Sequence, residues 1–248
     1  MEVKYLLDYT GQLLEVARFR DYCPNGLQVE GRSQIHTLVS GVSASHALLE
    51  AAAEAGADAI LVHHGWFWKS DEARVVGIRR QRLKFLLERE INLIAYHLPL
   101  DAHPQLGNNA QLAQRLGFNI ENWFGEQQIG AYGTLQTPVV LQVLCANVEQ
   151  ALQRKPLAIG EAQREIRRIA WCSGGAQSYL AQAIELGVDA FLTGEVSEHT
   201  VHLARESGVA FIAAGHHATE RYGVQALGEH LAAQFSLTHH FLDIDNPV

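Results

Sequence analysis

Two short stretches of this sequence combine side chains that bind transition metals in proteins. His63 and His64 are adjacent, and His216 stands four residues before Glu220. If a helix begins near Gly215, the second pair lies one turn apart on the same helix face. Two successive histidines at a strand end point in different directions, so they can serve two adjacent metals. Imidazole and carboxylate ligands suit zinc, iron, manganese or nickel, and no cysteine lies nearby to form a thiolate site.

An internal repeat adds further residues to this set. It aligns His97 with His216 and Asp101 with Glu220, so a histidine followed four residues later by a carboxylate occurs twice. Glu195 is the last residue of segment 187–195, which matches the segment 56–64 that ends with the histidine pair. One such pair is weak evidence, but four segments, two of them related by a repeat, favour a metal site. The matching segments are 56–64 with 187–195 and 92–103 with 209–220.

The elements that must position these residues follow from the spacing of apolar side chains. Each copy of the repeat reads strand, helix, strand, helix, strand. Continuous apolar runs between amphipathic helices predict a mainly parallel sheet covered on both faces. Ligands collect beyond the carboxyl ends of the strands in such sheets, where the histidines and carboxylates fall. The predicted strands are 36–42, 58–63, 91–97, 167–173, 189–194 and 209–215, and the predicted helices are 45–55, 80–90, 178–186 and 200–207.

The chain therefore reads as an α/β protein with two similar halves that arose by duplication. Residues 1–117 form the first half, with the double-histidine and HLPLD elements. Residues 166–248 form the second half, with the GHHATE element. Between them, residues 118–165 are predicted to be an inserted or linking segment. In that segment we expect a strand over 134–146 and a helix over 147–155.

Composition narrows the classes of protein to consider. The 248 residues are 48% hydrophobic and 19% charged, which excludes a disordered or collagen-like chain. A formal charge of −8 leaves no basic stripe for nucleic acid and counts against a dedicated nucleic-acid binder. Three widely spaced cysteines fit a reducing compartment, and no apolar run reaches the roughly 18 residues of a membrane span. We expect a cytoplasmic protein without a signal peptide or membrane segment.

With these features in place, the sequence resembles the Nif-three-like family, whose bacterial members are commonly named GTP cyclohydrolase 1 type 2 homologues. The resemblance implies two similar, interleaved α/β halves around a dinuclear metal site. It also implies a ring-shaped homohexamer whose metal sites face an internal cavity. The segments that carry it are DYCPNGLQVEG (21–31), GADAILVHHGWFW (56–68), HLPLDAHPQLGNNAQLA (97–113), LTGEVSEH (192–199) and AAGHHATER (213–221).

The same resemblance assigns roles to individual residues. His97 and Glu195 would lie beside the metals, as supporting or acid/base residues. The chemistry implied is that of a hydrolase, because two divalent cations roughly 3.5–4 Å apart can activate a water as nucleophile. His97 is the best proton-transfer residue, and Glu220 the best bridging ligand. The family's metal ligands fall on His63, His64, Asp101, His216 and Glu220.

Three functions remain open at this point. The first is a GTP cyclohydrolase-like enzyme acting on a nucleotide-like substrate, and the second is a phosphoesterase or amidohydrolase with the same metals. The third is a metal-binding oligomer that regulates or interacts without turnover. No Walker-type glycine loop is present, so a triphosphate would have to bind Lys69, Arg74 or Arg221. The aromatic residues 66–68 form either a substrate-stacking lip or a buried anchor, and Asn25 begins a turn.

Overall fold

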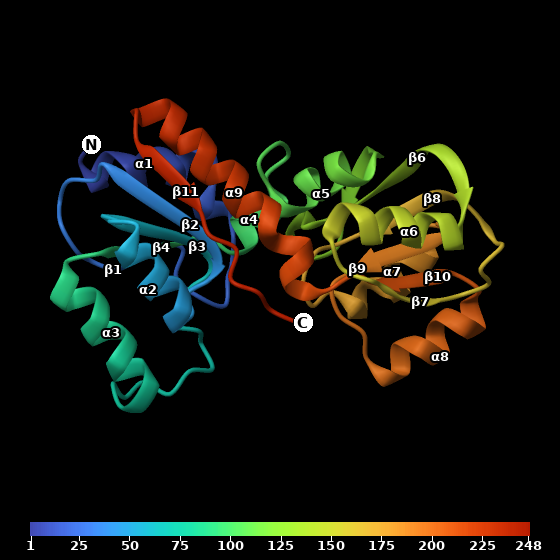
Figure 1. The fold of residues 1–248 in the computed structure, drawn as a ribbon. Coiled ribbons are helices and arrows are strands. Elements are labelled where there is room, and N and C mark those ends of the chain that lie inside the picture. Colours follow the sequence, from blue (N-terminus) through green and yellow to red (C-terminus); the bar gives the residue numbers. More distant parts are fainter. The chain divides into compact units, whose positions relative to one another are not determined.

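The computed structural model describes residues 1–248, which divide into two compact units (Figure 1). Unit 1 comprises Met1–Leu100 and Gly223–Asp245, and unit 2 comprises Asp101–Tyr222 and Asn246–Val248. The chain passes from one unit to the other within helix α4 (Leu98–Ala102) and within helix α9 (His216–Phe235). Because the chain returns to unit 1 near its end, the two units are interleaved in sequence, as expected.

Unit 1 contains a five-stranded sheet with the order β1-β4-β3-β2-β11. Strands β11, β2, β3 and β4 are parallel to their neighbours, and only β1 is antiparallel, pairing with β4. The prediction of a mainly parallel sheet is therefore confirmed for this unit. Its strands are β1 (Gly26–Val29), β2 (Thr37–Ser43), β3 (Ala59–His64), β4 (Asn92–Ala95) and β11 (Thr238–Phe241).

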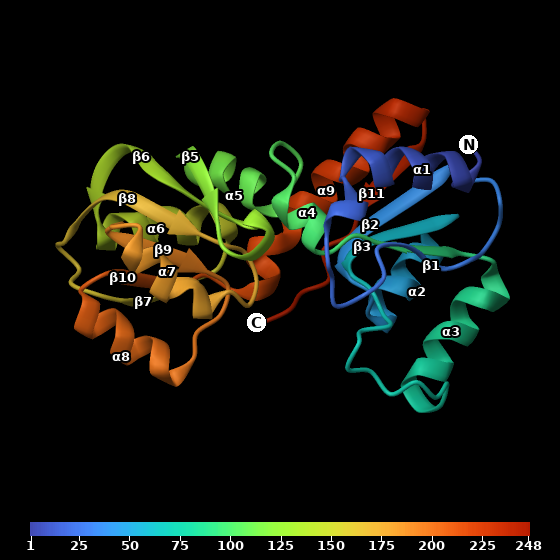
Figure 2. The same cartoon turned by 180° about the vertical axis from the view of Figure 1, so that it is seen from behind.

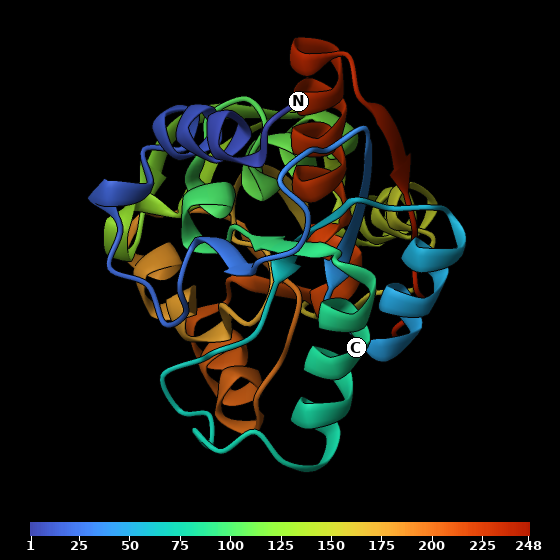
Figure 3. The same cartoon turned by 90° about the vertical axis from the view of Figure 1, so that its left-hand side faces the viewer.

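Helices cover both faces of this sheet (Figure 3). On one face, α2 (His46–Glu54) and α3 (Gly77–Arg89) bury Leu48 and Leu86 against Ile60. On the other face, α1 (Val3–Leu13) lies beside the later part of α9, where the ring of Tyr9 contacts those of His230 and Phe235. Successive side chains of β2, β3 and β4 are buried without a break, which requires such double coverage.

Unit 2 contains a six-stranded sheet with the order β5-β6-β8-β9-β10-β7. Only β8, β9 and β10 are parallel to one another, whereas the β5-β6, β6-β8 and β10-β7 pairs are antiparallel. The second sheet is thus mixed, because β5, β6 and β7 extend a parallel core. Its strands are β5 (Phe118–Phe124), β6 (Gly130–Val140), β7 (Leu157–Ile159), β8 (Glu165–Trp171), β9 (Ala190–Thr193) and β10 (Ala210–Ala213).

Two apolar clusters hold the helices on this second sheet. One joins α5 (Asn108–Leu116), α6 (Leu141–Leu152) and the first turns of α9 to one face, with Leu112 and Leu144 packed around Trp171. The other joins α7 (Leu180–Glu185) and α8 (Glu198–Ser207) to the opposite face, around Phe191 and Phe211. Figure 2 shows α7 on the face away from α6. Short 3₁₀ turns occupy Val16–Arg18, Glu126–Gln128 and Gln177–Tyr179.

The internal repeat is a structural one, and its clearest mark is a pair of aspartates. Asp58 accepts hydrogen bonds from two successive backbone N–H groups, just before and at the start of β2, at 2.7 and 3.0 Å. Its counterpart Asp189 accepts from two successive N–H groups of β8, at 2.9 and 2.8 Å. Arg32 forms an ion pair with Asp58, and Arg164 with Asp189. The same hydrogen-bonding arrangement, an aspartate that accepts from two successive backbone N–H groups, therefore joins neighbouring strands in both units.

Most predicted strands and helices lie where the sequence pattern put them, but one expectation needs correction. The strand expected over 134–146 ends at Val140, and Leu141 begins α6. Leu141, Leu144, Val148 and Leu152 are all buried, a helical spacing that the preceding apolar run concealed. Residues 118–165, expected as an inserted or linking segment, supply β5, β6, β7 and α6 to unit 2.

None of the helices combines the length and hydropathy that a membrane span needs.

Candidate metal centre

Three histidines lie together at the carboxyl ends of parallel strands in unit 1. His63 and His64 end β3, and His97 follows β4, its parallel neighbour. The ring centroid of His63 is 4.6 Å from that of His64 and 5.1 Å from that of His97. One ligand nitrogen from each of the three lies within 4.8 Å of the other two. Unit 1 thus brings together three of the residues singled out from the sequence.

The Nδ1 atoms of His63 and His64 are held by oxygen atoms of their own unit. Nδ1 of the fully buried His63 lies 3.0 Å from the backbone carbonyl of Tyr96. Because a carbonyl can only accept, this nitrogen carries the proton and Nε2 carries the lone pair. Nδ1 of His64 lies 3.0 Å from the hydroxyl of Ser43, at the end of β2. Such contacts at Nδ1 orient an imidazole to bind a metal through Nε2.

The third histidine of unit 1 is held by an aspartate that sequence reasoning missed. Nδ1 of His97 donates to Oδ1 of Asp21 at 2.7 Å. Asp21 also accepts from the backbone N–H of Leu98 and from the amide of Asn25, both at 2.9 Å. Asn25 in turn accepts from the backbone N–H of His97 at 2.8 Å, so it does more than begin a turn. No sequence signal links Asp21 to a histidine 76 residues away, because only the fold joins them.

Two buried carboxylates lie close together in unit 2. Asp101 belongs to α4 and Glu220 to the second turn of α9, and both are buried. Their ligand oxygens lie within 4.8 Å of each other. Asp101 Oδ1 accepts from the side chains of Asn108 at 2.8 Å and Ser173 at 3.2 Å, which fixes the carboxylate plane. Carboxylates held in this way are common metal ligands.

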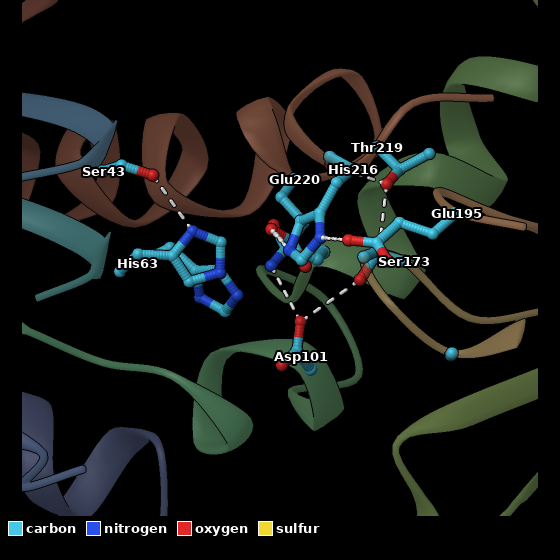
Figure 4. A network of polar contacts seen from close by, with 12 residues as sticks. Ser43, His63, Asp101, Ser173, Glu195, His216, Thr219 and Glu220 are labelled. Carbon is cyan, nitrogen blue, oxygen red and sulfur yellow. Dashed lines mark hydrogen bonds and ion pairs between the residues drawn. The ribbon is translucent and has the colours of Figure 1, made fainter. Parts of the chain in front are cut away.

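His216 lies between two carboxylates, as Figure 4 shows. It is the first residue of α9, and its Nδ1 is 2.6 Å from Oε1 of Glu195, which follows β9. Its Nε2 is 3.1 Å from Oε2 of Glu220, one helical turn further on. Burial alone would lower the pKa of His216, but hydrogen bonds and charge from Glu220 and Glu195 outweigh it and raise the pKa to about 9. The predicted pairing of His216 with Glu220 across one turn is confirmed.

A glycine-rich turn after β8 closes against these side chains. Gly174 has φ +65°, and its N–H donates to the Thr219 hydroxyl at 3.0 Å. A Cβ at Gly174 would lie 2.1 Å from Oε1 of Glu220. A Cβ at Gly194 would lie 2.6 Å from Cα of His216. Backbone approaches this close require glycine, and sequence reasoning gave neither position a role.

The donor chemistry of both units fits divalent metals. Four imidazoles have Nδ1 engaged by a carbonyl, a hydroxyl or a carboxylate, which directs Nε2 to any metal. Two buried carboxylates complete the set, and no thiolate is needed. Such nitrogen and oxygen ligands suit zinc, iron, manganese or nickel.

The structure gives contacts for the aromatic residues 66–68 and for the three basic residues considered as phosphate ligands. Trp66 is a buried anchor, since its indole N–H donates to the carbonyl of Ala44. Trp68 instead stands edge-on to the ring of His97, with centroids 5.0 Å apart. Of the three expected phosphate ligands, Lys69 and Arg221 donate to backbone carbonyls. The third, Arg74, lines a cavity of about 410 Å³ in unit 1 together with Arg79 and Arg82.

Comparison with known proteins places this chain among close relatives. The family model Duf34/NIF3 (NGG1p interacting factor 3) matches residues 1–247. A Pseudomonas aeruginosa protein named GTP cyclohydrolase 1 type 2 homolog is 56% identical over 245 residues, which cover 98% of this chain and 97% of that one. An Escherichia coli protein of the same name is 52% identical over 236 residues, or 94% of each chain.

Solved structures give the same result. The protein ybgI, whose structure is titled as one of unknown function, matches with a TM-score of 0.96 at 48% identity over the whole of both chains. The Thermus thermophilus protein TTHA1606 matches with a TM-score of 0.90 at 33% identity, again over the whole of both chains. The resemblance seen in the sequence is confirmed, and the chain belongs to the NIF3 family.

Proposed function

We propose that this protein is a metal-dependent hydrolase of a nucleotide-like substrate. One pair of divalent cations would be held by two histidines of unit 1 and by two carboxylates and one histidine of unit 2. The chain passes between the units within α4 and α9, the helices that carry the unit 2 ligands. The family resemblance, which implies one dinuclear site, supports a single centre. Its ligands would be His63, His64, Asp101, His216 and Glu220.

The observation that carries the proposal is the shared orientation of four histidines. In each of them Nδ1 is engaged, at 2.6 to 3.0 Å, by an oxygen atom from its own unit. Core histidines that serve only packing need no such uniform arrangement, whereas metal-binding histidines have it as a rule. All four also follow or end parallel strands, where α/β folds bind ligands.

Within the proposed centre the residues have different tasks. Two bound cations would lower the pKa of a water and stabilise the charge that develops on the substrate. Glu220 is placed to bridge, because its carboxylate lies near both His216 and Asp101. Glu195 fixes the ring of His216 from the Nδ1 side. His97 takes up a proton at Nε2 and returns it to the leaving group.

Two features support an anionic, nucleotide-like substrate. The relatives carry the name GTP cyclohydrolase 1 type 2 homolog, which refers to a purine nucleotide. In unit 1, the cavity lined by Arg74, Arg79 and Arg82 also holds Asp71 and Glu72, so arginines exceed acids by one in its wall. Nε of both Arg79 and Arg82 is buried without a hydrogen-bond partner. Guanidinium groups are well suited to phosphate oxygens.

The metal part of the proposal is tested by elemental analysis. Purified protein should contain about two transition-metal ions per chain, in keeping with the two-metal proposal. Glu220→Gln should lower that content, because it removes an anionic ligand while keeping the side-chain volume. The matched control is Glu229→Gln, an exposed position on the same helix, which should leave the metal content unchanged. Equal metal content in all three proteins would refute the site.

The hydrolase part needs a separate assay. Metal-loaded protein is incubated with GTP, with other nucleotides, and with small phosphate esters and small amides. The His216→Ala variant serves as the inactive reference. Turnover of GTP with release of formate would support the cyclohydrolase reaction, and turnover of another compound a phosphoesterase or amidohydrolase. Metal at full occupancy with no turnover above the reference would favour the alternative function, a metal-binding oligomer that regulates or interacts without catalysis.

Assembly and location belong to the proposal as well. A ring-shaped homohexamer of this chain in the cytoplasm agrees with the family resemblance and with the acidic, cysteine-poor composition. Native mass spectrometry should then find a species of six chains of 27.4 kDa each. A monomer or dimer at micromolar concentration would contradict the ring.

A further inference from the structure

The environment of His97 differs from those of His63 and His64, the two histidines beside it. Its Nδ1 faces a buried carboxylate, that of Asp21, rather than a neutral oxygen. Its ring is enclosed by Trp68 on one edge and by the rings of His63 and His64, with centroids 5.0 to 5.8 Å away. A buried carboxylate paired with an imidazole is the arrangement that supports proton transfer in many hydrolases.

Asp21 is built to remain a carboxylate in this position. Its side chain is 4% exposed, and it accepts hydrogen bonds from the N–H groups of Tyr22 and Leu98 and from the amide of Asn25, besides that from His97. Burial by itself would raise the pKa of Asp21, but the hydrogen bond and charge of His97 and the other donors lower it to about 2. The carboxylate therefore accepts from four donors and does not compete for a proton.

The duplicated half of the molecule contains a similar pair with a different environment. His216, the counterpart of His97, donates Nδ1–H to Glu195 at 2.6 Å. The Glu195 side chain is 36% exposed, against 4% for Asp21, and the Nε2 atom of His216 already faces the carboxylate of Glu220. Both halves thus contain a carboxylate–imidazole pair, but only the histidines are counterparts in the repeat, since Glu195 aligns with His64 and Asp21 lies outside the repeated segments.

We propose that Asp21 is the positioning residue for His97, which it holds as the Nδ1–H tautomer with Nε2 directed toward the metal-binding histidines of unit 1. The proposal rests on the hydrolase function proposed above. In the reaction, the oxygen of the attacking water forms a bond to the substrate while its proton passes to Nε2 of His97. The resulting imidazolium is stabilised by Asp21, which stays ionised, and Nε2 then gives the proton to the leaving group as the scissile bond breaks.

A competing role for Asp21 as a metal ligand is disfavoured by its neighbours. Asp21, Cys23 and His97 also have potential ligand atoms within 4.8 Å of one another. Burial and the nearby charge of Asp21 raise the pKa of the Cys23 thiol to about 12, so it stays protonated and binds metal poorly. Asp21 itself is already saturated with hydrogen bonds. We therefore assign proton transfer to His97 and its positioning to Asp21, and give neither residue a role as a metal ligand.

The first test is independent of any activity. Long-range ¹H–¹⁵N spectra of the histidine rings in metal-free protein should show His97 as the Nδ1–H tautomer, the signal being identified by its loss in His97→Gln. In Asp21→Asn, the tautomer should shift toward Nε2–H, because an amide no longer stabilises the Nδ1 proton as a carboxylate does. An unchanged His97 tautomer in Asp21→Asn would overturn the positioning role, whether or not the protein proves to be a hydrolase.

The second test compares the two carboxylate–imidazole pairs. Asp21→Asn should lower kcat on the order of 10- to 100-fold while leaving KM and the two metal ions in place. Glu195→Gln should instead weaken metal binding, because its partner His216 is a ligand. In the His97→Gln background, Asp21→Asn should cause no further loss of kcat, since the two residues act as one unit.

Three results would contradict the proposal in this second test. They are loss of metal in Asp21→Asn, an unchanged kcat, and additive effects with His97→Gln. If Asp21→Asn folds poorly, Asn25→Ala removes one donor that orients Asp21 and should give the same pattern with smaller amplitude. If no substrate is ever turned over, the hydrolase proposal fails but the tautomer and metal measurements still decide the role of Asp21.

Discussion

Replacing Gly174 by alanine should damage the proposed metal centre far more than it damages the fold. The left-handed φ of +65° costs any non-glycine residue about 1–2 kcal/mol. The added Cβ would also lie 2.1 Å from Oε1 of the buried Glu220. That oxygen would have to move by more than about 1 Å to reach ordinary van der Waals separation. Metal–ligand distances tolerate only about 0.2 Å, so the displaced carboxylate would no longer ligate properly.

A matched control separates the backbone cost from the clash. Gly187 has φ +66°, and a Cβ there would meet nothing within 4 Å. Gly187→Ala should therefore lower the stability of the metal-free protein by the backbone term alone, about 1–2 kcal/mol, or roughly 2–4 °C in Tm per kcal/mol. Its metal affinity should equal that of the unchanged protein. Gly174→Ala should raise the Kd for metal by at least tenfold.

Both quantities are measurable on the same preparations. Urea unfolding of metal-free protein gives the stability, and competition with a chromophoric chelator gives the Kd. The reasoning fails if Gly174→Ala binds metal as tightly as Gly187→Ala. It also fails if both variants lose affinity equally, because strain in the backbone would then explain the whole effect.

Two further predictions concern charges. Because the pKa of His216 is raised from 6.5 to about 9, the stability that its charge provides is present below pH 6.5 and lost as pH rises through 9. Over the same range metal affinity should rise with pH, because metal binding releases the proton of His216. Calorimetry in buffers of different ionisation enthalpy detects this proton release, and a pH-independent affinity would contradict the prediction. Asp58→Ala should cost about 3 kcal/mol in urea unfolding, since it removes the charged acceptor of two N–H groups. Asp189→Ala should cost less, its side chain being 32% exposed against 10%, and equal costs would count against the burial argument.

The pattern of apolar residues was sufficient to predict most of the fold. Runs such as residues 59–62 and 190–192 are apolar throughout, and burial on both faces of a parallel sheet requires that pattern. Where a strand and a helix follow each other without a polar break, as at Val140 and Leu141, the pattern fails, since both are apolar. The antiparallel pairing of β5, β6 and β7 left no mark in the sequence, because strand direction depends on the path of the connections.

The candidate site was predictable where its residues belong to one local element. His63 and His64 are adjacent on β3, and His216 and Glu220 lie one turn apart on α9, so secondary structure alone brings each pair together. The repeat then pointed to His97. These relations need no knowledge of the tertiary fold.

The sequence by itself thus determined the fold class, the family and the types of candidate ligand, because periodicity, motifs and the repeat are local properties of the chain. Only the tertiary structure brought Asp21 to His97, or set Gly174 against Glu220. Each of these contacts joins two residues that are dozens of positions apart in the chain. The sequence around either residue does not indicate which distant residue it will contact. They arise because parallel strands bring the ends of distant segments to one edge of each sheet, and there the close contacts of the site are made.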